Sequence, residues 1–186
     1  MSIERTMNRI WFSDQPDSIY EALTKSFGEH NQGFTEVRWT LADVLSIPSL
    51  SDSAKRVLSS DTIHWILKSD IARYAILAND GGWYADMDFE FSGSLDEYCQ
   101  YDLFLEISDR GIGNALIGAR PRHPILESAR DTAVKNVLGF DGQLDPHSVY
   151  CLTGPWMFHK CVVQHRKSIG KHRCLGISKT GWTKTL

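Results

Sequence analysis

The sequence predicts an α/β sandwich, because strand-like and helix-like segments alternate along most of its length. Its 186 residues, 42% of them apolar and 11% aromatic, suffice to bury the core of one domain and are too few for two. An amphipathic helix is predicted over residues 61–79, and two glycines end it before a further strand-like run. We therefore expect a single domain over residues 1–186.

The first third of the chain supplies two predicted strands and the helix between them. Apolar and aromatic residues predict strands over residues 8–12 and 34–40. The segment 17–28 predicts a helix, since its apolar residues fall on one face and a glycine lies at its end. Residues 41–60 are polar and contain only short helical pieces. This order is the beginning of an alternating α/β fold.

The helix predicted over residues 61–79 carries a carboxylate beside its apolar stripe. Ser60 or Asp61 can cap its first turn, and its apolar residues recur at three- and four-residue spacing. Asp70 lies on the edge of this stripe, where a charge is costly unless it is paired, and Arg73 follows three residues later. The two form either a local surface ion pair or a polar pair at the end of a cleft.

The second half of the chain continues the alternation. Strands are predicted over residues 83–91, 102–108 and 114–119, and helices over 124–138 and 153–166, followed by a mixed tail over 172–186. The helix over 124–138 has clear limits, because a proline opens it and a glycine follows it.

Two carboxylates interrupt the strand-like run 83–91. On a regular strand Asp86 and Asp88 would face the same side, and two like charges on one face invite a hard cation such as Mg²⁺ or Mn²⁺. Mg²⁺ commonly binds through one or two carboxylates together with the phosphates of a substrate. Phosphatases of the haloacid dehalogenase type also place a DxD after a strand, but they follow it with Thr where this chain has Glu90. We therefore expect a metal–diphosphate ligand.

The composition excludes several classes of protein. The chain has 20 basic and 23 acidic residues, so it lacks the basic excess typical of a dedicated nucleic-acid-binding protein. The four cysteines form no CxxC pair that would suggest a zinc knuckle. No leader-like apolar stretch begins the sequence, and no run approaches the length of a membrane span. We expect a cytoplasmic protein with free thiols and no membrane span.

Two adjacent segments resemble a known family. The runs SDIARYAIL (residues 69–77) and GGWYADMD (residues 81–88) resemble the sugar-binding segment of DXD-containing glycosyltransferases. That family includes mannosyltransferase-like enzymes of capsule and glycan synthesis and their relatives, the clostridial glucosylating toxins. Looser similarities occur in NRIWF (8–12), NALIGA (114–119) with His123-Pro124, Thr153-Gly154-Pro155, and Thr180-Gly181-Trp182.

The resemblance implies a GT-A fold, a Rossmann-like α/β/α sandwich with a mixed central sheet. It implies transfer of a hexose from a UDP- or GDP-sugar, assisted by Mn²⁺ or Mg²⁺, with retention of the anomeric configuration. The acceptor would be a hydroxyl of a glycan, a lipid-linked molecule or a protein. By this resemblance Asp88 ligates the metal, Asp86 contacts the ribose and the metal, and Asp70 and Arg73 hold the sugar hydroxyls.

Further residues are assigned by the same resemblance. Trp11 would stack on the nucleotide base, and Asn114 would line the sugar pocket. Thr180 and Trp182 would close over the diphosphate, and His172 would complete the metal shell. Trp11, Asn114 and Trp182 also have purely structural interpretations, as a core aromatic, a turn residue and a packing residue.

Two other functions fit the same sequence. One alternative is a nucleotide-sugar-binding or regulatory module without activity. The other is a small phage-type enzyme whose acceptor is DNA, which the net charge of −3 disfavours. The chain is also shorter than most members of the family, which add acceptor-binding insertions, so we expect it to act on an exposed or large acceptor or together with a partner.

Overall fold

In the computed structural model, the described residues are 2–13, 18–108, 111–165, 174–177 and 183–185, and they fold around one mixed β-sheet. The strands are β1 (Thr6–Ile10), β2 (Thr35–Trp39), β3 (Gly82–Ala85), β4 (Leu103–Ser108), β5 (Gly111–Ala119), β6 (Cys174–Ile177) and β7 (Thr183–Thr185). Within these residues the strand order is β2-β1-β3-β5-β4-β6-β7. The pairs β1–β2, β1–β3 and β4–β6 are parallel, and the pairs β3–β5, β4–β5 and β6–β7 are antiparallel.

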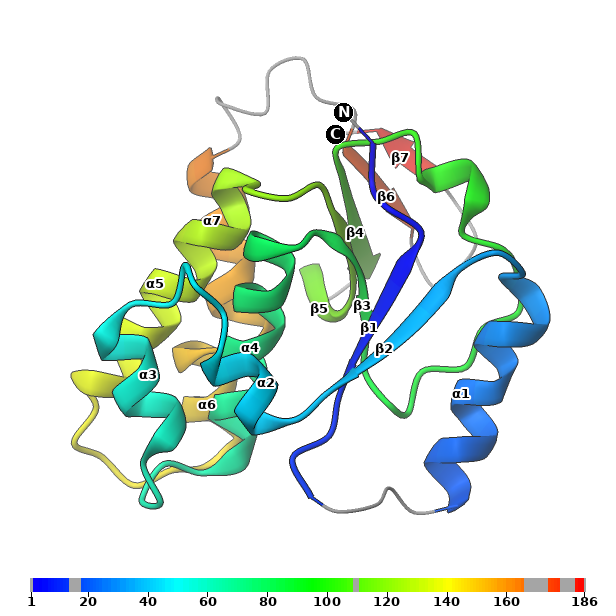
Figure 1. The fold of residues 1–186 in the computed structure, drawn as a ribbon. Helices are drawn as coiled ribbons and strands as arrows, with labels where there is room; N and C mark the ends of the chain where they lie inside the picture. Colours follow the sequence, from blue (N-terminus) through cyan, green and yellow to red (C-terminus); the bar gives the residue numbers. More distant parts are fainter. Residues whose placement is uncertain (1, 14–17, 109–110, 166–173, 178–182, 186) are drawn as a thin grey trace.

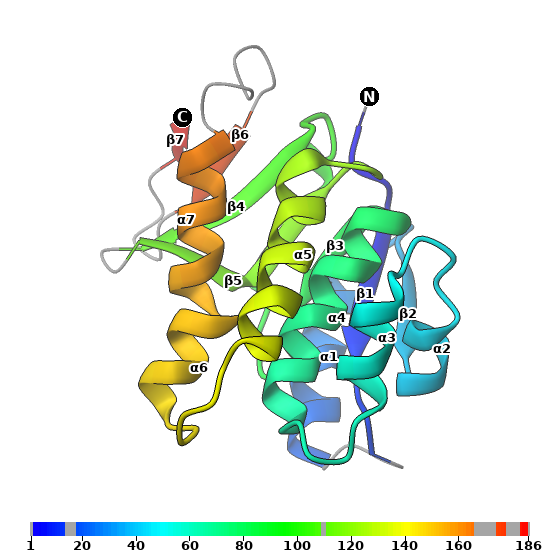
Figure 2. The ribbon, with the colours of Figure 1, turned by 90° about the vertical axis from the view of Figure 1, so that its left-hand side faces the viewer.

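Helices cover both faces of this sheet. They are α1 (Ser18–His30), α2 (Leu41–Leu45), α3 (Asp52–Ser59), α4 (Trp65–Asn79), the 3₁₀ helix η1 (Asp96–Tyr98), α5 (Pro124–Leu138), α6 (Pro146–Leu152) and α7 (Pro155–His165). Helices α4, α5 and α7 lie side by side over one face, and α1 lies on the other (Figures 1 and 2). Helices α2, α3 and α6 pack against the first group. None of the helices in the described ranges is both long enough and apolar enough to cross a bilayer.

The two faces of the sheet have separate apolar cores. The larger core joins α4, α5 and α7 to the sheet through residues such as Ile71, Ile117 and Phe158. The smaller core lies on the α1 side, where Phe27 packs with Trp83 and other aromatic residues. Burial of apolar surface on both faces is what stabilises a three-layer sandwich.

Two glycines turn the chain from α4 into β3. Gly81 and Gly82 have φ angles of 70° and 83°, a region that residues with a Cβ atom rarely adopt. A Cβ atom on Gly81 would lie 2.6 Å from Pro121, and one on Gly82 would lie 2.7 Å from the carbonyl of Thr6. The pair therefore lets β3 pack directly against β1 after the sharp turn that ends α4.

Most predicted elements are present, with shifted limits at several ends. The helix over 124–138 has the predicted bounds. The first strand was predicted over 8–12 but spans Thr6–Ile10, and the strands over 34–40, 102–108 and 114–119 differ by a few residues at their ends. The helix over 153–166 is α7, and the separate helix α6 before it was not predicted.

The predicted cap of the long helix is wrong. The helix α4 begins at Trp65, and the side chain of His64 accepts a hydrogen bond from the Ile66 amide at 3.3 Å. The hydroxyl of Ser60 instead accepts a hydrogen bond from the Thr62 amide, within a turn that precedes the helix. Serine side chains often form such local turns in competition with helix capping.

Candidate active site

Asp86 and Asp88 lie in a β-turn that directly follows β3. The amide of Asp86 donates to the carbonyl of Ala115 (2.9 Å), and the amide of Phe89 donates to the carbonyl of Asp86 (3.1 Å), which closes the turn. The prediction that both carboxylates lie on a regular strand is therefore wrong, because β3 ends at Ala85. Aspartate is unfavourable in strands and favourable at the first position of a turn, which explains where the strand ends.

Arg73 joins the turn to helix α4. Its Nη1 atom lies 2.9 Å from Asp86 Oδ1, and its Nη2 atom lies 3.1 Å from Asp70 Oδ1. The Nη1 atom also donates to the carbonyl of Asn114 (2.8 Å), and the guanidinium lies over the ring of Tyr84 at 4.6 Å. Burial by itself lowers the pKa of Arg73, but the carboxylates of Asp86 and Asp70 outweigh it and raise that pKa. Arg73 is therefore a permanently charged group between two acids.

A buried polar network surrounds Asp70. Its Oδ1 atom accepts from Asn114 Nδ2 (3.0 Å), and its Oδ2 atom accepts from the hydroxyl of Thr153 (2.7 Å). The same Asn114 amide group donates to the hydroxyl of Tyr74 (2.9 Å), which donates to the carbonyl of Thr153 (2.8 Å). Burial raises the pKa of the Asp70 carboxyl, and the pairing with Arg73 opposes that shift. The three groups bonded to its oxygens, from Arg73, Asn114 and Thr153, are all donors, which suits the ionised form of the carboxyl.

The topology of the sheet brings these distant residues together. Because β5 runs antiparallel to β3, the amino-terminal part of β5 lies beside the carboxyl end of β3. This places Asn114 next to the turn at Asp86, while α4 crosses behind with Asp70 and Arg73. Thr153 lies in the short link between α6 and α7.

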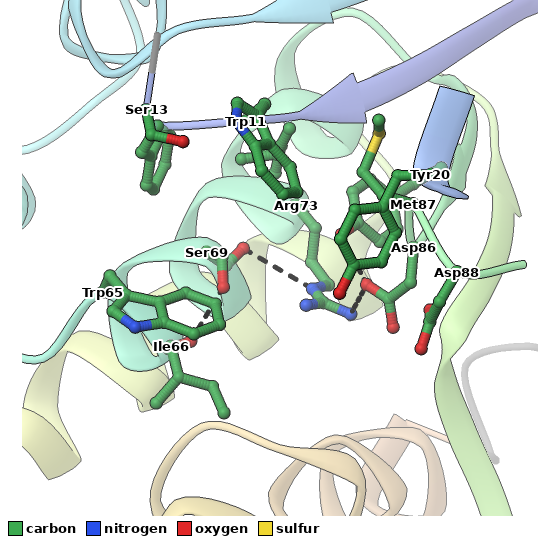
Figure 3. A pocket seen from close by; sticks show the side chains of 13 residues that line it. Trp11, Ser13, Tyr20, Trp65, Ile66, Ser69, Arg73, Asp86, Met87 and Asp88 are labelled. Carbon is green, nitrogen blue, oxygen red and sulfur yellow. Dashed lines mark hydrogen bonds and ion pairs between the residues drawn. The ribbon is translucent and has the colours of Figure 1, made fainter. Parts of the chain in front are cut away.

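A cavity of about 680 Å³ opens in front of Arg73. It is lined by Ile10, Trp11, Phe12, Ser13, Tyr20, Trp65, Ile66, Ser69, Arg73, Tyr84, Asp86, Met87 and Asp88. Figure 3 shows the guanidinium of Arg73 directed towards Asp86, with Trp11 and Trp65 at separate places on the wall. The rings of Trp11 and Tyr20 are 5.3 Å apart. The cavity thus combines an aromatic part with a charged part.

Asp70 and Asn114 lie behind the wall of this cavity. Neither is among the lining residues, and the exposed fractions are 5% for Asp70 and 6% for Asn114. Both contact Arg73 directly, and Arg73 does line the cavity.

The carboxylates of the turn fit a divalent cation that also binds a substrate. Asp88 is exposed and forms no hydrogen bond or ion pair with the described residues. Asp86 Oδ1 accepts from Arg73 and from the hydroxyl of Tyr84 (2.7 Å), whereas none of the described residues binds its Oδ2 atom. The part of the chain that the structure describes contains no cluster of three His, Cys, Asp or Glu residues that could hold a metal. Two carboxylates completed by substrate phosphates match the chemistry of Mg²⁺ and Mn²⁺.

Three assigned residues fall outside the described part of the chain, and two residues that line the cavity were not assigned. His172, Thr180 and Trp182 fall outside the described residues, so their assigned roles stay predictions. Sequence reasoning placed Tyr20 on the apolar face of its helix and gave no role to Trp65, yet both line the cavity. The signal for Trp65 was a large aromatic residue in the first turn of the helix that carries Asp70, and its side chain is 62% exposed.

Comparison with known sequences identifies relatives of this chain. Residues 3–105, more than half of the chain, match the family model "Glycosyltransferase sugar-binding region containing DXD motif". An uncharacterized glycosyltransferase of Acanthamoeba polyphaga mimivirus is 33% identical over 106 residues, which cover 54% of this chain and 40% of the relative. Inositol phosphoceramide mannosyltransferase 2 of Schizosaccharomyces pombe is 21% identical over 150 residues, which cover 74% of this chain and 40% of the relative. The chain thus spans less than half the length of these curated relatives.

Solved structures show the same fold. The PaToxG glycosyltransferase superposes with a TM-score of 0.72 over 90% of this chain and 71% of that structure, at 17% identity. The UDP-bound glycosyltransferase domain of the YGT toxin superposes with a TM-score of 0.69 over 97% of this chain and 80% of that structure, at 9% identity. The predicted GT-A fold is confirmed. With the family match over residues 3–105, the chain belongs to the family of glycosyltransferases with a DXD-containing sugar-binding region.

Proposed function

We propose that this domain transfers a hexose from a UDP- or GDP-sugar to an acceptor hydroxyl, with a divalent cation bound at Asp86 and Asp88. One observation carries the proposal: open carboxylates and a buried, charged arginine meet in a single cavity that also has aromatic walls. A nucleotide-sugar needs these three environments, for its metal-bound diphosphate, its polar sugar and its flat base. The UDP-bound YGT toxin domain, which shares the fold, supports this choice of ligand.

The geometry suggests how a donor would lie in the cavity. The base would stack on Trp11 or Trp65, because aromatic faces bind bases of any sequence. The diphosphate would lie near the exposed carboxylate of Asp88, where a bound cation neutralises it. The sugar would then lie towards Arg73, whose remaining donors and charge suit hydroxyl and phosphate oxygens.

The chemistry follows from the charge that develops during transfer. When the anomeric C–O bond breaks, the nucleoside diphosphate departs with increased negative charge and the sugar acquires oxocarbenium character. A divalent metal bound here supplies Lewis-acid stabilisation of that charge. Arg73 adds a fixed positive charge that Asp70 and Asn114 hold in place, so little reorganisation is needed during the reaction.

Asp70 serves in this proposal to position Arg73 and does not act as a base. Its oxygens accept from Arg73, Asn114 and Thr153, and its exposed fraction is 5%. A general base must reach the proton that it removes. The oxygens of Asp70 are already engaged by these donors.

A donor screen tests the proposal. The protein is incubated with a panel of UDP- and GDP-sugars and Mn²⁺ or Mg²⁺, and the released nucleotide is measured. GDP-mannose and ceramide-linked acceptors belong in the screen, because the S. pombe relative is named an inositol phosphoceramide mannosyltransferase. We expect slow hydrolysis of one donor, which EDTA abolishes and an acceptor accelerates, and NMR of the product will report whether the configuration is retained.

Other outcomes separate the alternatives. Tight binding of a nucleotide-sugar in calorimetry, with no turnover of any donor, would indicate a binding module instead of an enzyme. Failure to bind any nucleoside diphosphate in the presence of Mn²⁺ would overturn the proposal.

A further inference from the structure

Arg9 is a buried arginine on β1 that the proposed reaction does not use. Its side chain is fully buried and lies against Phe27 of α1, in the smaller core. The guanidinium lies near the rings of Phe27 and Phe91, at 5.8 Å and 5.5 Å from their centres. Its Nε and Nη2 atoms form no hydrogen bond with any described residue, and the ion-pair contact with Glu36 is long, at 4.0 Å.

One atom of this guanidinium, Nη1, forms hydrogen bonds with described residues. It contacts the first residue of the β-turn over residues 86–89, which we call the acidic turn. Arg9 Nη1 donates to the carbonyl of Asp86 at 2.7 Å and lies 3.4 Å from the carbonyl of Ala85. The Asp86 carbonyl is also the acceptor for the Phe89 amide, the bond that closes the turn. Arg9 therefore binds the acidic turn at its first residue, where β3 leaves the sheet.

The segment after the turn is held from the same side. The amide of Phe91 donates to the hydroxyl of Ser26 on α1 at 2.9 Å, and the ring of Phe91 packs on Phe27 at 5.2 Å. Between the two anchor points only the turn itself, with the carboxylates of Asp86 and Asp88, reaches the cavity.

Burial of this charge works against stability. Two of the three guanidinium nitrogens, Nε and Nη2, have no hydrogen-bond partner among the described residues, so this buried charge is incompletely compensated. Removing one partner of a close buried ion pair is destabilising, whereas replacing buried charged groups by apolar residues of similar volume is often neutral or stabilising. The contact of Arg9 with Glu36, at 4.0 Å, is not a close pair, and the Glu36 side chain is 35% exposed. The hydrogen bonds that this guanidinium does form with described residues all go to the backbone of Ala85 and Asp86, so its position is best explained by the turn that it holds.

We propose that Arg9 is a positioning residue: its buried guanidinium fixes the Asp86 carbonyl so that the carboxylates of Asp86 and Asp88 project together into the cavity. The proposal rests on the cation site of the proposed function. It adds that the geometry of that site depends on β1 as well as on the turn itself.

The test compares Arg9→Met and Arg9→Lys with the wild type and with Phe34→Leu. Phe34 packs edge-on against Phe27 at 5.6 Å and belongs to the same core, so its substitution perturbs the packing and leaves the carbonyl contact intact. Binding of Mn²⁺ in the presence of UDP or GDP is followed by the loss of the electron paramagnetic resonance signal of free Mn²⁺. Hydrogen exchange of the peptide covering residues 86–91 reports on the turn without any metal, and the unfolding temperature reports on the fold.

We expect Arg9→Met to lower Mn²⁺ affinity by about 10- to 100-fold, the range typical of groups that orient metal ligands. Its unfolding temperature should stay the same or rise, and its turn should exchange faster. Arg9→Lys should recover part of the affinity, because an ammonium group can still donate to the carbonyl. Phe34→Leu should lower the unfolding temperature and leave Mn²⁺ affinity unchanged.

The proposal is overturned if Arg9→Met binds Mn²⁺ as the wild type does, or if Phe34→Leu loses as much affinity. If Arg9→Met does not fold, Arg9→Lys takes its place, and an Arg9→Lys variant with the full Mn²⁺ affinity of the wild type would overturn the proposal. If the wild-type protein fails to bind Mn²⁺ both in the presence of UDP and in the presence of GDP, the proposed function and this inference are overturned together. If the wild type and Arg9→Met both bind Mn²⁺, with equal affinity, only the inference is overturned and the proposed function stands.

Discussion

The network around Asp70 and the turn around Asp88 place the same side chain in opposite environments. Asp70 is buried, and its two oxygens accept hydrogen bonds or an ion pair from Arg73, Asn114 and Thr153. Asp88 is exposed, and nothing in the described ranges binds its carboxylate. Asp86 lies between the two extremes: its side chain is 31% exposed, and its Oδ1 atom is bound by Arg73. The charge of Asp70 is thus compensated within the protein, whereas the charge of Asp88 has no partner among the described residues.

The protein itself holds Arg73 in place, whereas the partner of the Asp88 carboxylate has to come from a ligand. The inner network fixes Arg73 before any ligand arrives, as a preorganised site requires. The outer carboxylate has no such partner, so a cation that arrives with a diphosphate can take that place. Substitutions on the two sides should therefore differ in their effect on stability, on ligand binding, or on both.

The largest effect on stability is expected for Asp70→Ala. This change removes the acceptor that Arg73 Nη2, Asn114 Nδ2 and the Thr153 hydroxyl share, and breaking a buried ion pair costs about 3–5 kcal/mol of unfolding free energy. Asp88→Ala, the matched change on the open side, should stay within about 0.5 kcal/mol of the wild type. Urea unfolding of both variants measures the contrast. Equal stability of the two variants would show that the buried network does not stabilise the fold.

A smaller effect, confined to ligand binding, is expected for Trp65→Ala. The exposed indole contributes little to folding, but stacking of a base on an aromatic ring contributes about 1–3 kcal/mol. The affinity for the bound nucleotide should therefore fall by roughly 5- to 150-fold in calorimetry, with unchanged unfolding. Trp156→Ala is the control, because this tryptophan is 39% exposed and does not line the cavity. Equal losses in both variants would contradict the assignment.

The smallest effect is expected far from the cavity, at the capping box of α2. The hydroxyl of Thr40 accepts from the amide of Asp43, and the carboxylate of Asp43 accepts from the amide and hydroxyl of Thr40. Thr40→Ala should cost about 1 kcal/mol of unfolding free energy and leave donor hydrolysis unchanged. A loss of hydrolysis would mean that general stability, and not the site, limits activity.

The same capping box predicts a pH dependence with a definite sign. Hydrogen bonds from Thr40 lower the pKa of Asp43 below its usual value. The folded state then holds fewer protons than the unfolded state, so this stabilisation is present above the ordinary aspartate range. It is lost as the pH falls through that range towards the lowered pKa. Unfolding measured from pH 7 down to acid should show a smaller loss in Thr40→Ala than in the wild type.

Local signals predicted the elements that local chemistry determines. A proline at the start and a glycine at the end gave the limits of α5, and the glycine pair after Asn79 marked the end of α4. The helix α6 was missed although Asp145 and Ser148 form a capping box, because serine replaces the glutamate that usually marks one. The acidic turn was taken for strand because aromatic residues surround it.

Contacts between distant segments could not be predicted in the same way. The pattern of α4 placed Asp70 at the edge of the apolar stripe, but its burial depends on Asn114 and Thr153, which lie 44 and 83 residues further along the chain. The carbonyl contact of Arg9 crosses 77 residues and depends on the parallel pairing of β1 with β3. Family resemblance named Asp70, Arg73, Asp86 and Asp88 together, but only the fold shows which acid is compensated.

The most direct test of the account is metal-dependent release of nucleotide by Asp88→Ala, measured with the donor that the screen identifies. We expect a loss of about 100-fold or more, because a metal contributes several kcal/mol to stabilising the departing group and each 1.36 kcal/mol is tenfold in rate. The unfolding free energy should stay within about 0.5 kcal/mol of the wild type. An Asp88→Ala variant that hydrolyses the donor at the wild-type rate with the same dependence on Mn²⁺ would contradict the claim that this open carboxylate binds the cation.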